Sequence, residues 1–205
     1  MSVDDKTRNG RVCLLLLNAC PVGLRRFIEH NYTTNGFARF DGFLDQWNIK
    51  HNLFHLRFKS CCSVHCTNAN RSTPICTEQW DLLYKETLSR NPHGDGRKCP
   101  CMYTAIPGVT TEVMDVTLCC LLLRNCMSGG INMVHIEQIC AVRNQILHSN
   151  SATLDEQTFN DIWRRLEKSL LHIAAQVSSE FHNEVRKTIK ETKTSFCDNS
   201  REVCL

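Results

Sequence analysis

The sequence predicts an all-α fold, a helical bundle of five or six helices. Apolar residues recur three or four positions apart over long stretches, which is the period of a helix with one buried face. No stretch shows the alternation of a half-buried strand, and typical capping residues precede several of the apolar runs. A chain of 205 residues is long enough to bury a core of its own.

The first two predicted helices cover residues 8–30 and 41–58. Pro21 interrupts the first, since proline has no backbone N–H to donate and favours a kink or a restart. The second carries aromatic and leucine side chains at mixed spacing, and we still expect a helix because no turn-forming cluster divides it.

Two polar loops that carry cysteines follow, at residues 59–73 and 89–109. Both are rich in residues that favour turns. Between them, residues 74–88 are predicted to form a helix. Thr73 would be its N-cap and Pro74 its first residue, where the missing N–H costs nothing.

The next predicted helix, at about 112–127, is expected at the centre of the bundle. Thr111 would cap it, with Glu112 and Asp115 in the first turn, where the helix dipole favours acidic side chains. Its segment VTLCCLLL is apolar on every side, as in helices that are buried all round.

Two further helices are predicted at about 132–148 and 153–177. The second begins with a capping box formed by Thr153 and Glu156. Its apolar residues form one continuous stripe: Phe159, Ile162, Trp163, Leu166, Leu170, Ile173 and Val177. From Ser178 the apolar face thins, so we expect a charged tail.

An arginine interrupts the apolar stripe of the helix at 132–148. The stripe is expected to consist of Ile136, Ile139, Cys140 and Leu147, and Arg143 falls on it. A guanidinium keeps its proton, so its burial requires a carboxylate, a phosphate or several carbonyls. Asn144 and His148 are four residues apart and therefore share the adjoining face.

Arg143, Asn144 and His148 together suit phosphodiester chemistry. A histidine can move the proton of a ribose 2′-OH, an arginine can stabilise charge on phosphate oxygens, and an asparagine can orient either group. A structural alternative stays open. Arg143 would then pair with an internal acid, Asp115 or Glu156, and His148 would be an ordinary residue at a helix C-terminus.

The segment RNQILH, at 143–148, resembles the signature of the HEPN superfamily, in which arginine precedes a polar residue and then a histidine. The similarity covers about 75–177, and the N-terminal part more loosely. Other segments resemble the HEPN domain of the DAZ-interacting zinc-finger ubiquitin ligases, a DZIP3-like HEPN family: residues 77–84, 114–126 and 154–174.

The resemblance implies an all-helical domain that is commonly a homodimer, with the motifs of two chains meeting at a shared cleft. In catalytic members the motif serves metal-independent cleavage of RNA. Arg143 would then stabilise phosphate, Asn144 would be its polar neighbour and His148 the acid and base. In the ubiquitin-ligase branch the domain also serves as an RNA-binding or protein-interaction module. The chain shows no spaced cysteine and histidine series of a RING finger.

We therefore predict three segments. Residues 1–74 hold the N-terminal helices and a cysteine-bearing loop and belong to the same domain as the rest. Residues 75–177 form the HEPN-like core, and 178–205 form a helix end and charged tail. The alternative function is a non-catalytic scaffold for dimerisation or protein interaction. A third hypothesis is a zinc-stabilised interaction module in which the cysteine-bearing loops matter more than Arg143.

The chain has 14 cysteines, and four of them are weak candidates for a structural zinc site: Cys62, Cys66, Cys99 and Cys101. His65 is an alternate ligand. Neither loop has the usual spacing of two residues between ligands, so reduced thiols are the competing interpretation and we assign no cofactor.

Charge and hydropathy place few limits on the function. The net charge of +3 is too small to indicate nucleic-acid binding by itself. The chain has no apolar run of the ~18 residues that a membrane span needs. The apolar run Val12–Leu17 is short for a signal peptide, and Asp4 and Asp5 precede it. We expect a cytoplasmic protein that forms a homodimer and binds RNA or other proteins.

Overall fold

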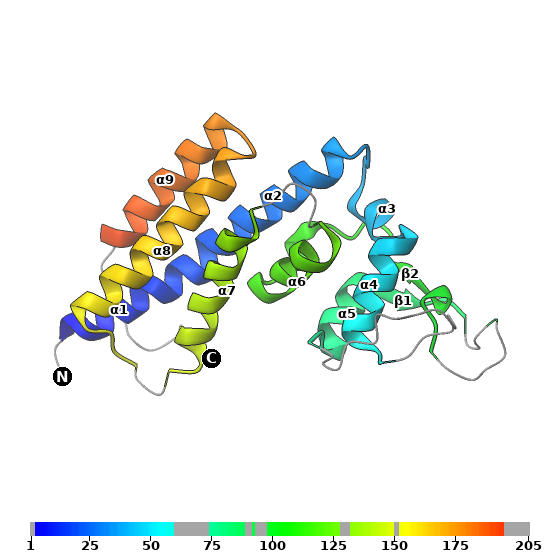
Figure 1. Cartoon of the computed structure of the whole chain (residues 1–205), viewed down its shortest axis with the longest axis horizontal. Helices are drawn as coiled ribbons and strands as arrows, with labels where there is room; N and C mark the ends of the chain where they lie inside the picture. Colours follow the sequence, from blue (N-terminus) through cyan, green and yellow to red (C-terminus); the bar gives the residue numbers. More distant parts are fainter. Residues whose placement is uncertain are drawn as a thin grey trace. The chain divides into compact units, whose positions relative to one another are not determined.

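A computed structural model describes residues 3–59, 74–88, 92, 98–127, 132–149 and 152–194. The described chain is predominantly helical, which confirms the all-α class (Figure 1). The α-helices are α1 (Val3–Leu14), α2 (Cys20–Thr34), α3 (Phe40–Leu44), α4 (Trp47–Arg57), α5 (Thr77–Leu83), α6 (Val116–Cys126), α7 (Met133–Leu147), α8 (Glu156–Ala175) and α9 (Ser179–Thr194). None of them combines the length and the apolar composition that a membrane span requires.

The helices fall into two compact units. Unit 1 comprises Met1–Phe27 and Gly130–Leu205, and unit 2 comprises Ile28–Gly129. Unit 1 therefore joins the first helix of the chain to the last three. These units follow contacts between elements, whereas the boundaries expected at 74 and 177 follow sequence similarity.

The first helical stretch changes its hydrogen bonding at the predicted proline. A π-helical turn, η1 (Leu15–Ala19), separates α1 from α2. The backbone N–H of Cys20 donates to the carbonyl of Leu15, which is one residue farther back than in an α-helix. Pro21 follows directly and donates no such bond, so the ladder is interrupted there and resumes in α2.

The core of unit 1 is built on α8, which packs against α7, α9 and α1 (Figure 1). Six of the seven residues of the predicted stripe are buried: Phe159, Ile162, Trp163, Leu166, Leu170 and Ile173. Val177 lies beyond the end of α8 and is partly exposed. Gly23 of α2 allows a close approach to this stripe, because a Cβ atom added there would lie 3.1 Å from Cδ2 of Leu170.

Residues 179–194, expected to hold a helix end and part of a charged tail, form a separate helix, α9. Phe181, Val185 and Ile189 are buried on its inner face. They lie four residues apart, so they form a narrow stripe that packs on α8. The many lysines of this segment occupy the exposed face and do not prevent the helix.

Two helices begin at aspartates and not at the predicted threonines. Asp115 caps α6 and Asp155 caps α8. In each case the carboxylate accepts a hydrogen bond from the backbone N–H three residues later, at 2.7 Å in α6 and 2.9 Å in α8. Thr111 instead opens a short 3-10 turn, η3 (Thr111–Val113), and Thr153 precedes the helix. Aspartate caps at least as well as threonine, so the sequence offered two acceptable starts.

Unit 2 contains a small antiparallel hairpin that the sequence did not predict. Strand β1 (Tyr84–Glu86) pairs with β2 (Tyr103–Ala105), which follows a 3-10 turn, η2 (Pro100–Met102). The helix expected over 74–88 is accordingly shorter: α5 begins after Cys76 and ends at the strand. Three residues are too few for alternation to be visible in a sequence.

An aromatic cluster forms the core of unit 2. Trp80 of α5 stacks on Tyr84 with a centroid distance of 4.4 Å and meets Tyr103 edge-on at 5.2 Å. Phe54 of α4 also contacts Trp80, at 6.0 Å. The buried hydroxyl of Tyr84 donates to the carbonyl of Leu44 at 2.9 Å. Aromatic packing thus ties the hairpin to α4 and α5.

We expect Gly23→Val to destabilise the protein by about 1–3 kcal/mol, because the added carbons overlap Leu170 and force it to move. Gly42→Val is the matched control, since a Cβ at Gly42 meets no atom within 4 Å. Urea unfolding of both variants measures the difference. Equal stability of the two variants would contradict close packing between α2 and α8.

Candidate functional site

Arg143 lies on the packed side of α7, as the sequence predicted. The buried residues of this helix include Ile136, Ile139, Cys140 and Val142. Each residue turns a helix by about 100°, which places Arg143 within the arc that they define. Arg143 is itself only partly exposed. A permanent charge therefore lies at the margin of an apolar face.

Leu147 is the exception to the predicted stripe, because 59% of it is exposed. Its angle around the helix still points to the packed side. It is the last residue of α7, and the described part of unit 1 does not cover this final turn. The C-terminal end of α7 therefore presents an apolar side chain beside the arginine.

Arg143 has a single hydrogen bond within the described residues. Its Nη1 donates to Oδ1 of Asn144 at 3.1 Å. Of the two acids proposed as ion-pair partners, Glu156 lies 3.6 Å from Arg8 and Asp115 caps α6. Within the described part of unit 1, no carboxylate lies at salt-bridge distance from Arg143.

His148 ends the helix and is exposed. Its backbone N–H donates to the carbonyls of Asn144 and Ile146. His148 lies five residues after Arg143, which corresponds to about 140° around the helix. The structure thus joins Arg143 to Asn144 but does not bring the His148 and Arg143 side chains together in one chain.

A buried polar cluster between α7 and α8 was missed by the sequence analysis. His135 is only 6% exposed, and its Nδ1 lies 3.3 Å from Oγ of Ser169. Ser169 donates in turn to Oε1 of Gln138 at 2.7 Å. The ring of His172 stacks on His135 with centroids 4.0 Å apart. These bonds satisfy polar groups that would otherwise be costly to bury.

The environment of His135 favours its neutral form. Burial lowers its pKa, and the nearby His172 and Lys168 lower it further. The signal in the sequence was a polar pair three residues apart on each helix, at 135 and 138 and at 169 and 172.

The zinc candidates are only partly described. Cys62 and Cys66, and the alternate ligand His65, lie outside the described residues. Cys99 is buried and caps the η2 turn, where its Sγ accepts a hydrogen bond from the backbone N–H of Cys101 at 3.3 Å. The described residues contain no group of three or more potential metal ligands. The zinc site stays a prediction.

A protein-family model matches most of the chain. Residues 61–202 match the model of the DZIP3/hRUL138-like HEPN family, which is more than half of the chain. The chain belongs to this HEPN family. The matched region includes α5 through α9, so both the motif helix and the helix that supports it lie inside the HEPN domain.

No curated protein and no solved structure shows detectable similarity to the chain. The family match extends beyond the segment 75–177 in which the resemblance was noticed, at both ends. Its C-terminal extension includes α9, in the segment expected to hold a helix end and charged tail. The HEPN domain therefore includes the stripe of Phe181, Val185 and Ile189.

The His135 cluster should make stability depend on pH. Because the folded state lowers the pKa of His135, the unfolded chain binds the proton more tightly, and stability falls as pH drops below about 6.5. We expect His135→Leu to flatten this fall between pH 7 and 5. His182→Gln, on α9, removes a histidine outside the cluster and should leave the fall in place. Thermal melts across this range measure both, and an unchanged slope in His135→Leu would exclude the cluster as its source.

Proposed function

We propose that this HEPN domain binds RNA at the C-terminal end of α7, with Arg143 contacting phosphate. The observation that carries the proposal is the partly buried guanidinium whose one hydrogen bond in the described chain goes to an amide. Phosphate oxygens would accept the remaining N–H donors in a charge-assisted, bidentate geometry. The family membership supports the same end of α7 as the functional surface.

The catalytic form of this proposal is metal-independent endoribonuclease activity. The ribose 2′-oxygen attacks the adjacent phosphorus, the bond to the 5′-oxygen breaks, and a 2′,3′-cyclic phosphate remains. His148 would accept the proton of the 2′-OH or supply one to the leaving oxygen, since it is exposed and able to reach a ligand. Asn144, already bonded to Arg143, would hold the guanidinium toward the phosphate.

A homodimer would assemble this site. Arg143 and His148 lie on different sides of one helix, so a single α7 does not direct both at the same phosphate. A second copy packed against the end of α7 would add its own histidine near the first arginine. The exposed Leu147 supports such an interface, because it offers an apolar contact at the same turn.

A non-catalytic scaffold is the second candidate. Besides Leu147, α7 exposes Val134 near its other end, at 54%. Two exposed apolar residues on the motif helix favour protein association whether or not RNA is cut. In this version Arg143 would pair with a carboxylate of a partner chain.

Substitutions at the motif should separate cleavage from folding. We expect His148→Ala to reduce RNA cleavage by about 10²–10⁴-fold, the usual loss for an acid or base. Arg143→Ala should weaken both RNA binding and cleavage while the melting temperature changes little, because no carboxylate among the described residues loses its partner. Gel assays on mixed single-stranded RNA, with and without EDTA, and thermal melts give the measurements.

Arg164→Ala is the matched control for Arg143→Ala. Arg164 lies on α8 and is exposed, with an i,i+3 ion pair to Asp161. It should leave RNA binding nearly unchanged. If the wild type binds RNA and Arg143→Ala binds it equally well, the proposed phosphate contact is ruled out. Binding without cleavage would leave an RNA-binding module, and a wild type that neither binds nor cuts RNA would leave only the scaffold.

Self-association should depend on the end of α7. Leu147→Asp places a charge at the proposed interface and should yield monomers at tens of micromolar, without loss of stability, since the side chain is exposed. Leu17→Asp is the matched control, because Leu17 of η1 is 57% exposed in the same unit. Light scattering decides, and a monomeric wild type would reject the dimer.

A further inference from the structure

Unit 2 contains a pocket that the HEPN motif does not use. It lies at the C-terminal end of α4, beside α5 and the hairpin, and has a volume of about 390 Å³. Small-molecule sites typically start near this size. Aromatic side chains form much of its lining: Phe58, Trp80, Tyr84 and Tyr103. An aromatic lining suits a planar or apolar ligand more than a highly charged, strongly hydrated one.

Arg57 supplies a guanidinium at this aromatic lining. Its Nη2 donates to Oγ1 of Thr77 at 2.6 Å, and its carbon Cζ lies 5.2 Å from the centre of the Phe58 ring. None of the described carboxylates is within salt-bridge distance of it, although Glu78 is close enough for Arg57 to contribute to lowering its pKa. The guanidinium is positioned by a hydroxyl and a ring and keeps unused donors.

Two buried donors in the pocket lining lack an acceptor within the described residues. They are Nε of Arg57 and Nε1 of Trp80. Both atoms are shielded, so a ligand oxygen reaches them only if a lining side chain shifts.

A second cation of the pocket is already neutralised. Lys98 Nζ lies 2.8 Å from Oε2 of Glu86 and 5.8 Å from the centre of the Tyr103 ring. The hydrogen bond from Lys98 to Glu86 raises the pKa of Lys98. With this pair cancelled, the remaining charges of the lining are those of Arg57, Lys85 and Asp81, a positive balance.

We infer that this pocket binds a small organic anion, a phosphate or carboxylate attached to a planar apolar body. Arg57 would hold the oxyanion, since guanidinium matches both groups in a bidentate geometry. Phe58 and Tyr103 would contact the planar body. Lys98 is ion-paired with Glu86, and this pairing limits how strongly the pocket attracts anions.

The inference is independent of RNA binding at α7. Every residue of the pocket lies in unit 2, and Arg143 lies in unit 1. Arg57 and Phe58 precede the residues matched by the HEPN family. A failure of one proposal therefore leaves the other intact.

Four probes test the chemistry on the full chain. Phenyl phosphate and benzoate carry a planar body with a phosphate or a carboxylate. Phenol has the body alone, and inorganic phosphate has the anion alone. We expect titration calorimetry and ligand-observed NMR to detect phenyl phosphate or benzoate, and to find both phenol and inorganic phosphate at least about tenfold weaker. The stronger of the two organic anions identifies the preferred oxyanion.

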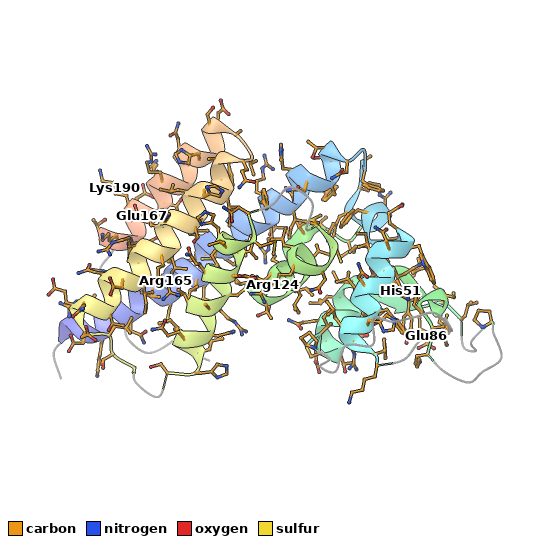
Figure 2. The ribbon with its side chains drawn as sticks, viewed as in Figure 1. His51, Glu86, Arg124, Arg165, Glu167 and Lys190 are labelled. Carbon is orange, nitrogen blue, oxygen red and sulfur yellow. The ribbon has the colours of Figure 1, made fainter. Side chains whose placement is uncertain are left out.

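Three substitutions test the roles of the pocket residues. Arg57→Gln should weaken the preferred probe by about tenfold or more, and Arg57→Lys should restore part of the affinity by restoring the charge. Glu86→Gln should strengthen binding, because Lys98 is released to the anion. Arg124→Gln is the matched control. Arg124 is exposed on α6 in the same unit and lies outside the pocket lining, and Figure 2 labels both Arg124 and Glu86.

The test is decisive because Arg57→Gln and Glu86→Gln are expected to change the affinity in opposite directions. Weaker binding in Glu86→Gln together with tighter binding in Arg57→Gln would overturn the inference in favour of a cationic ligand. Equal losses in Arg57→Gln and Arg124→Gln would show that only net charge matters and would also reject the pocket. So would no binding of either organic anion at millimolar concentration. Circular dichroism melts show whether each variant is folded. If Arg57→Gln does not fold, the affinity of Arg57→Lys is compared with that of the wild type instead.

Discussion

The apolar stripe of α8 is the packing interaction on which unit 1 depends. Its side chains recur every three or four residues along a helix of 20 residues, so they form one continuous surface. That surface packs on α1, α7 and α9, which come from opposite ends of the chain. The approach of α2 through Gly23 uses the same surface, at Leu170. Because α8 packs against α7, this stripe helps to fix the orientation of the motif helix.

Local periodicity explains which parts of this fold the sequence could predict. The helix expected at 132–148 was observed at Met133–Leu147, because its apolar residues recur at helical spacing. α9 was missed because three apolar residues in a lysine-rich segment bury little surface alone, and only contact with α8 makes them a core. The hairpin was missed for a related reason: its strands pair across an intervening loop, and neither is long enough to show a period.

The candidate site was also predictable only in part. The sequence showed that Arg143 interrupts an apolar stripe, and the structure places it there, partly exposed. Periodicity also predicted burial of Leu147, which failed because the angle around a helix does not tell where its covering neighbours end. The partners of Arg143 were not predictable. Asp115 and Glu156 were plausible from charge alone, but Asp115 caps α6 and Glu156 lies beside Arg8.

The two kinds of polar residue on α7 differ in how far the chain satisfies them. His135 is almost fully buried, yet its Nδ1 is hydrogen-bonded to Ser169, which in turn donates to Gln138, so packing between α7 and α8 accounts for it. Arg143 lies nearer the surface, carries a permanent charge and has one amide as its hydrogen-bond partner among the described residues. The pattern recurs in unit 2, where Arg57 contacts a hydroxyl and an aromatic face, and no carboxylate in the described part of the unit is bonded to it. A guanidinium that is partly removed from water and left without an anion is costly unless something outside the chain completes it. That cost, and not the presence of charge as such, is the physical reason to look for external oxyanions at these two arginines.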